Sequence, residues 1–301
     1  MKNKFFFKIL VFFLFFLNAN SQEDIIFNAG QINILNNGNL VKATNGSEVI
    51  LPDNIIITSE ELDYDKIDLI LEFNKSIIAE DKINNIKLET EKLKYFKNKN
   101  ILNTYNKTII LIQSNYKINS SDVVYDKKND LVFSKQPSKI TDKYNNKINV
   151  NSFTYDVIKK IIKADKIKIE DIENNKYFFE NAIFDLNNNR IAGKDVEIKL
   201  DEKLFYPKND PRFKGRSVII TEDSTEIAKG VFTTCAIRSN DKCPPWHIKA
   251  EKVEHNKKNK LINYKNAWLK VYDMPVLYFP KFFHPDPTVE RQSGFLLPTV
   301  S

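Results

Sequence analysis

The chain has 301 residues, which is enough for one large domain or two ordinary ones. Apolar residues make up 42% and charged residues 28% of it, which is typical of a folded protein and argues against a disordered one. The formal net charge is +7, but lysines and acidic residues are interspersed and no nucleic-acid-binding motif is present, so the charge indicates a solvated surface and no nucleic-acid partner.

The first 21 residues have the pattern of a secretory signal peptide. Three lysines give it a basic start, an apolar run follows at 9–17, and the small residues Ala19 and Ser21 stand at positions −3 and −1 of a cleavage site. The apolar run is shorter than the roughly 20 residues of a membrane-spanning helix, so an uncleaved anchor is the less favoured alternative. We expect an exported chain that begins near Gln22, with a net charge of +7 − 3 = +4.

An aromatic residue recurs every 29 to 31 residues after this segment. Two positions before each aromatic the residue is apolar, four positions before it is polar, and seven positions before it is apolar again. Positions −2 and 0 share one face of a strand because side chains alternate with a period of two, whereas position −7 is out of phase. A bulge or bend is therefore expected between positions −5 and −2. The aromatics are Tyr64, Tyr95, Tyr125, Tyr155 and Phe184, with His255 as a later relative.

A polar turn and a second apolar run follow the aromatic. The segments 125–133 (YDKKNDLVF) and 255–263 (HNKKNKLIN) are near copies, and their Asn and Asp residues tolerate tight turns. Each repeat is thus predicted to be a strand–turn–strand unit of about 30 residues. Stacked units bury each other's apolar faces, so the predicted fold class is all-β and built from repeats.

The apolar side of this stack has two interpretations, which do not conflict. It is either a packed core or a concave face wide enough to hold a lipid. We expect nine residues to face inward, some of them lining a lipid groove. They are Leu62, Tyr64, Leu93, Tyr95, Val123, Tyr125, Phe153, Tyr155 and Phe184.

Catalytic chemistry is not indicated by the sequence. A serine nucleophile elbow, a glycine-rich phosphate loop and an HExxH motif are all absent. The carboxylates at position −4, such as Glu91 and Glu180, recur with the repeat, which favours a structural role. A β-helical polysaccharide lyase would need such acids clustered on one face or a calcium site, and here Ser121 and Asn151 interrupt them. We therefore predict no catalytic residue and no cofactor.

Two cysteines lie in the last third of the chain. Cys235, Cys243 and His247 fall within 13 residues of each other, but structural zinc takes four ligands and typically uses closely spaced cysteine pairs. With no fourth ligand evident, no metal site is predicted. In an exported chain a disulfide between Cys235 and Cys243 is the default, and pairing of one of them with a more distant cysteine outside this chain is the open alternative.

From about residue 206 the chain departs from the plain repeat and resembles the family of lipopolysaccharide-assembly outer-membrane proteins called LptD, also known as the OstA or organic-solvent-tolerance family. The resemblance covers about the last third of the chain. The N-terminal repeats are similar to the OstA domain that this family shares with the periplasmic bridge protein LptA. The matching segments are GVFTTC at 230–235, the W-x-I-x-A-x-x-V pattern that starts at Trp246, NAWLKVYDMPVLYFPKF at 266–282 and RQSGFLLP at 291–298.

The resemblance implies a definite architecture. Residues 22–270 would form a periplasmic β-jellyroll of the OstA/LptA type, also described as a β-taco, which is open on one side and holds lipopolysaccharide acyl chains. Unpaired strand edges would join it to an LptA-like bridge protein by strand pairing. The family's C-terminal barrel accepts an LptE-like lipoprotein. These implications place the chain at the periplasmic face of the outer membrane and make it a non-enzymatic protein.

Residues 271–301 are expected to be a junction followed by the truncated first strand of an outer-membrane barrel. Five of the chain's 11 prolines lie here, and proline cannot donate a ladder hydrogen bond, so it limits strands and edge pairing. In the family the first barrel strand carries a proline at the position of Pro298, beside the seam where the barrel opens sideways. The resemblance therefore makes Pro298 a lateral-gate candidate.

The function predicted from the sequence is the binding and conduction of lipopolysaccharide from the periplasmic bridge to the outer-membrane translocon. A freestanding LptA-like bridge protein is the first alternative, and the proline-rich ending of the chain argues against it. The polysaccharide lyase is the second alternative.

Overall fold

The computed structural model describes residues 25–201, 210–235, 244–285 and 289, so the predicted signal peptide lies outside the described residues. Within these ranges the chain forms 23 β-strands and two short 3-10 helices. The prediction of an all-β chain is confirmed. No helix in the part of the chain that the structure describes has the length and apolar character of a membrane span.

The elements follow one another closely along the chain. The first half contains β1 (Ile26–Leu35), η1 (Asn36–Gly38), β2 (Leu40–Ile50), η2 (Pro52–Asn54), β3 (Ile55–Ser59), β4 (Glu61–Asp65), β5 (Ile70–Asp81), β6 (Ile86–Phe96), β7 (Ile101–Thr104), β8 (Lys107–Ile112), β9 (Tyr116–Ser121), β10 (Val124–Asp126) and β11 (Leu131–Ser134). The second half contains β12 (Ser138–Thr141), β13 (Lys147–Val150), β14 (Ser152–Asp156), β15 (Ile161–Glu170), β16 (Lys176–Asp185), β17 (Arg190–Lys199), β18 (Arg212–Ile220), β19 (Ser224–Ala228), β20 (Val231–Thr233), β21 (Trp246–Asn256), β22 (Leu261–Val271) and β23 (Met274–Pro285).

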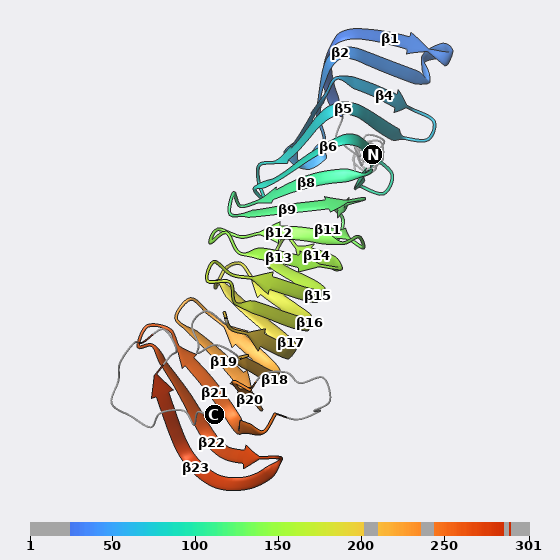
Figure 1. The fold of residues 1–301 in the computed structure, drawn as a ribbon. Coiled ribbons are helices and arrows are strands. Elements are labelled where there is room, and N and C mark those ends of the chain that lie inside the picture. The colour runs from blue at the N-terminus through green and yellow to red at the C-terminus, as the bar shows by residue number, and fades with distance from the viewer. Residues whose placement is uncertain (1–24, 202–209, 236–243, 286–288, 290–301) are drawn as a thin grey trace, which may run out of the picture.

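The strands form one long, twisted stack that runs from β1 to β23 (Figure 1). The stack has two layers. Strands β7, β10, β11 and β14 pair in succession in the first layer, and β8, β9, β12 and β13 pair in succession in the second. Long strands join the layers, because β6 pairs with β7 through its second half and with β8 through its first half. The whole therefore resembles a sheet folded lengthwise, with antiparallel pairing in both layers.

The fold line, here called the crease, coincides with the polar position −4 of the repeat. In β5 and β6 it is a bulge, where Lys75 and Ser76 with positive φ face the single residue Glu91. The Ser76 backbone N–H donates to the Glu91 carboxylate at 3.3 Å. Further along, Lys166 with a φ of 48° lies opposite Glu180. A local bend at a polar residue thus reverses the phase of side-chain alternation, as the repeat pattern requires.

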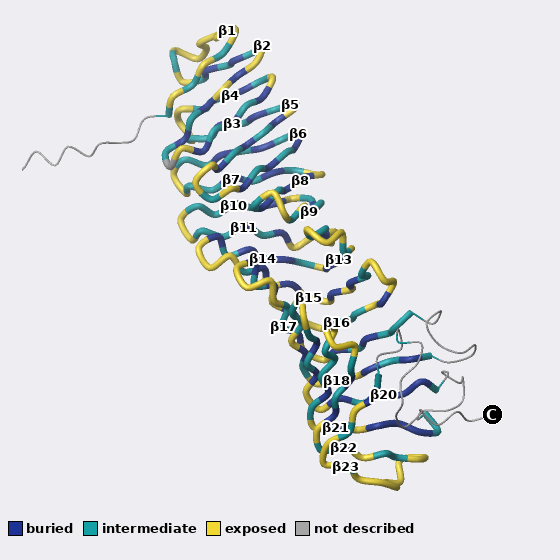
Figure 2. Tube along the Cα trace, turned by 90° about the vertical axis from the view of Figure 1, so that its left-hand side faces the viewer, coloured by how far each residue is buried: buried dark blue, intermediate teal, exposed yellow. Residues whose placement is uncertain are grey.

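Two continuous rows of paired residues hold the layers together. In the first layer every aromatic of the repeat pairs with an apolar residue on both neighbouring strands, as Tyr125 does with Leu102 and Val132. Isoleucines that stand seven positions before an aromatic, such as Ile118 and Ile148, form a matching row in the second layer. These side chains belong to one hydrophobic core. Figure 2 shows buried positions alternating along the strands, with exposed positions gathered in the turns.

Several hairpin turns, at 81–84, 126–129 and 185–188, carry an Asp-x-x-Asn signature. The Asp126 carboxylate accepts hydrogen bonds from the backbone N–H and the side-chain amide of Asn129, and Asp185 does the same with Asn188. The next residue, such as Asp130 with a φ of 52°, has the left-handed backbone that closes the turn. The polar spacers between apolar runs therefore encode the turns locally.

Candidate functional site

The interior between the two layers is where the predicted groove residues lie. Tyr64 is half-buried against the core. The other eight have exposed fractions of at most 4%: Leu62, Leu93, Tyr95, Val123, Tyr125, Phe153, Tyr155 and Phe184. These side chains belong to one hydrophobic core, and the expectation that some of them line a lipid groove stays a prediction.

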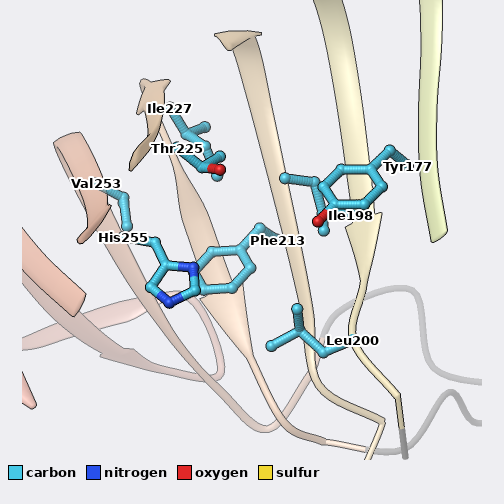
Figure 3. A pocket seen from close by; sticks show the side chains of 8 residues that line it. All are labelled: Tyr177, Ile198, Leu200, Phe213, Thr225, Ile227, Val253 and His255. Carbon is cyan, nitrogen blue, oxygen red and sulfur yellow. The ribbon is translucent and has the colours of Figure 1, made fainter. Parts of the chain in front are cut away.

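A small cavity remains between the layers near the C-terminal end (Figure 3). Tyr177, Ile198 and Phe213 reach it from the second layer, and Val253 and His255 from the first. Its volume is about 20 Å³, which is room for roughly one water molecule. An acyl chain needs far more space than this cavity offers.

The two layers also meet along a side opposite the crease, here called the mouth. It is the side where the second-layer turns 82–85 and 113–115 face the first-layer turn 157–160. An open-sided pocket of about 370 Å³ lies there, lined by Ile83, Asn84, Asn85, Gln113, Ser114, Val157 and Lys160. Amide and hydroxyl groups thus border the apolar interior at this level.

A buried polar cluster joins the layers beside this pocket. The Tyr125 hydroxyl donates to Asp81 Oδ2 at 2.6 Å, and Lys127 Nζ donates to the same oxygen at 3.1 Å. The side chains of Lys127 and Asp81 are only 6% and 2% exposed. Asn84 adds two hydrogen bonds to the carboxylate, through its backbone N–H and its side-chain amide.

Burial and hydrogen bonding shift the pKa values in this cluster in opposite directions. Burial alone would raise the pKa of Asp81, but the hydrogen bonds from Tyr125, Asn84 and Lys127 outweigh it and lower the value. Burial raises the pKa of Tyr125, and its hydrogen bond to the Asp81 carboxylate raises it further. Asp81 is therefore a charged acceptor and Tyr125 a neutral donor at neutral pH.

Two other buried tyrosines of the row have different surroundings at the hydroxyl. The Tyr95 hydroxyl donates to Asn100 at 3.2 Å, within the β6–β7 hairpin of the first layer. The Tyr155 hydroxyl is buried and has no hydrogen-bond partner among the residues that the structure describes. Burial raises the pKa of Tyr155 to about 12. Tyr125, in contrast to Tyr155, makes a hydrogen bond to the second layer.

Each end of the stack exposes apolar residues of one interior row. Ile34 of β1 pairs with Val41, the partner of Tyr64, and so extends the aromatic row of the first layer, yet it is 65% exposed. Ile32 pairs with Ala43, the partner of Leu62, and is 45% exposed. Within the described residues β1 pairs with β2 alone, so its outer edge has no strand partner there. An unpaired edge with exposed apolar side chains is suited to strand addition.

The opposite end is formed by β23. Its inward residue Leu277 pairs with Leu269 and is 49% exposed. Pro275, Pro280 and Pro285 lie in β23, which pairs with β22 alone among the described residues. Edge strands tolerate proline because their outer N–H groups need no partner. The stack thus continues through residues 274–285, inside the segment expected to be a junction.

The cysteine and gate predictions fall mostly outside the described residues. Cys235 is half-buried, with its sulfur 3.8 Å from the Trp246 carbonyl oxygen, whereas Cys243 and Pro298 lie outside the described residues. The disulfide and the gate stay predictions. His247 is buried, and its Nε2 lies 3.7 Å from Asp273. No group of three or more His, Cys, Asp or Glu residues is placed to hold a metal in the described ranges.

Comparison with known proteins finds similarity to LPS-assembly proteins. No family model matches the chain. The LPS-assembly protein LptD of Pseudomonas fluorescens is 28% identical over 149 residues, 46% of this chain and 15% of that protein. The LptD of Legionella pneumophila is 37% identical over 90 residues, 29% of this chain and 10% of that protein. The LptD of Idiomarina loihiensis is 32% identical over 117 residues, 36% of this chain and 15% of that protein.

The chain is an LptD-like protein. It spans about 15% of the length of the first of these relatives. In this LptD-like chain the cluster of Asp81, Tyr125 and Lys127 is the feature that sequence reasoning missed. Tyr125 was singled out only as an inward aromatic, and Asp81 lies 44 residues earlier in the chain. The repeat of about 30 residues does not predict a pair at that separation.

Proposed function

We propose that the chain binds lipopolysaccharide in the cell envelope and conducts it from a periplasmic bridge protein toward an outer-membrane translocon. The observation that carries this proposal is the pair of apolar rows that run through the stack, the first-layer row being exposed at the β1 end and the second-layer row at the β23 end. The similarity to LPS-assembly proteins supports it, because their name states the process in which they act.

The energetics of an apolar interior suit a conduit. Burying an acyl chain stabilises the complex by about 0.8 kcal/mol per CH₂ group. Such contacts have no preferred direction, so a chain can slide from one level of the stack to the next without losing specific hydrogen bonds. A lipid would replace contacts between the two layers with contacts to its own chains, with the hydrogen-bonded crease as the fixed side.

Partners are proposed for the two ends of the stack. The exposed edge of β1 would add a strand from an LptA-like bridge protein. The β23 end would lie toward the outer membrane, where an LptE-like lipoprotein and a barrel belong to the proposed assembly. In a protein that carries a barrel, Pro298→Ala would tighten the barrel seam and slow lipid export, and unchanged export would count against the gate.

Site-specific photo-crosslinking tests the proposal. A benzophenone side chain at Phe153 or Tyr155, both buried in the interior, is expected to capture purified lipopolysaccharide. The same group at Lys128, an exposed turn residue, is the control. Capture confined to the inward positions supports the conduit. Capture at Lys128 alone would show that lipid binds the outside and that the interior is only a core.

A further inference from the structure

The ion pair between Lys127 and Asp81 differs in kind from other ion pairs of the stack. Glu72 binds Lys92 and Lys94, and these three residues lie on the neighbouring strands β5 and β6 within the first layer. Their side chains are 27% to 42% exposed. Lys127 and Asp81 instead belong to different layers, and both are buried. The contact therefore resists separation of the layers rather than of two paired strands.

The surroundings of this contact place it at the boundary between the interior and water. Tyr125 is part of the continuous inward row, and its ring also lies under the Lys127 ammonium, 5.0 Å from ring centre to nitrogen. Asn84 binds the Asp81 carboxylate and lines the mouth pocket at the same time. If the cluster opened, the pocket and the space between the rows would become continuous.

A polar contact is suited to reversible opening. A buried ion pair contributes little net stability compared with apolar residues of similar size, because its charges have lost their hydration. When the layers separate, Asp81 and Lys127 regain water, whereas an apolar contact would expose its surface. The cluster thus fixes which residues meet at the mouth, and it adds little to the free energy needed to separate the layers there.

We propose that Asp81, Tyr125 and Lys127 form a latch that holds the two layers together at the mouth, and that its opening admits acyl chains to the interior. The nature of the cargo rests on the proposed function. The latch itself sets the width of the mouth, and this width can be measured without lipid.

The mouth width is measured by spin labels at Ile83 and Ile158, which lie on facing turns and are 67% and 68% exposed. The labels are attached to cysteines in a chain whose Cys235 and Cys243 are replaced by serine. The latch variant combines Asp81→Asn with Lys127→Met, which removes both charges. The milder Tyr125→Phe variant removes one hydroxyl and serves if the double variant does not fold.

A matched control combines Glu72→Gln with Lys92→Met, which removes an ion pair within one layer. The latch variants are expected to gain a population with a longer distance between the labels, and the control is expected to keep the wild-type distribution. A wild-type distribution in the latch variants would overturn the latch, even if their stability fell.

Lipid loading is then followed by the rate of lipopolysaccharide capture at a benzophenone in place of Phe153. The latch variants are expected to load several-fold faster than the wild type, and the control at the wild-type rate. A widened mouth with an unchanged loading rate would overturn the latch as a gate. A widened mouth in the variants, with no capture by any protein including the wild type, would uphold the latch and refute the proposed function.

Discussion

The Tyr125 hydroxyl and the Asp81 carboxylate meet across the two layers at 2.6 Å, although 44 residues separate them in the chain. Tyr125 belongs to the aromatic row of the first layer. Asp81 ends the half of strand β5 that lies in the second layer. Their contact links the packed interior to the polar mouth. It makes the mouth the place where the stability and the proposed opening of the stack can be probed together.

Replacing Tyr125 with phenylalanine is expected to lower the free energy of unfolding by about 1 to 3 kcal/mol, because the buried Asp81 carboxylate loses a donor. Urea denaturation measures the change. The control is Tyr155→Phe, which removes a buried hydroxyl that has no hydrogen-bond partner among the described residues and should cost less. Equal losses in the two variants would show that the charged acceptor adds nothing.

The stability of the stack should depend on Asp81 in acid. Since the folded pKa of Asp81 is lowered from 3.8, its contribution is fully present above pH 3.8. The contribution is lost as the pH falls through the lower folded value. As the pH is lowered from about 6 to about 2, the free energy of unfolding should fall less steeply in Asp81→Asn than in the wild type. The same dependence of unfolding free energy on pH in the two proteins would contradict the stabilising role of the Asp81 carboxylate.

Gly193→Ala should destabilise the stack by about 1 to 3 kcal/mol, because the added methyl group collides with the ring of Phe179. Gly193 pairs with Ala182 and Val218, so the backbone has little freedom to move away. Thermal or urea unfolding reports the loss. Adding Phe179→Leu makes room and should recover part of the stability, whereas a purely additive double variant would argue against the collision.

The β1 end is expected to carry the contact with a bridge protein. Changing Ile32 and Ile34 to aspartate should abolish binding of an LptA-like protein in a titration, with a change in stability of less than about 0.5 kcal/mol per residue because both side chains are exposed. Ile67→Asp is the matched control, since Ile67 is 72% exposed and lies in a turn. If the variant with aspartate at positions 32 and 34 still binds the LptA-like protein, the contact does not lie at the β1 end.

Local patterns in the sequence determined the strands and turns of this protein. The alternation around Leu93 and Tyr95 predicts which side of each strand faces inward, and the polar residue before them, Glu91, predicts the bend. The Asp-x-x-Asn spacers close the hairpins through hydrogen bonds that span only three residues. These features depend on neighbours along the chain, so a single sequence is enough to predict them.

The relation between the two layers was decided by the tertiary structure. Alternation says that Tyr125 and Tyr155 face inward, but it does not set the distance or the offset of the opposite layer. The offset brings Asp81 to the hydroxyl of Tyr125, while the hydroxyl of Tyr155 has no partner among the described residues. The close approach of the layers also packs the inward side chains into one core, whereas alternation alone was compatible with either a core or a groove. Both outcomes depend on how strands stack and twist over many repeats, because side chains far apart in the sequence then compete for the same space.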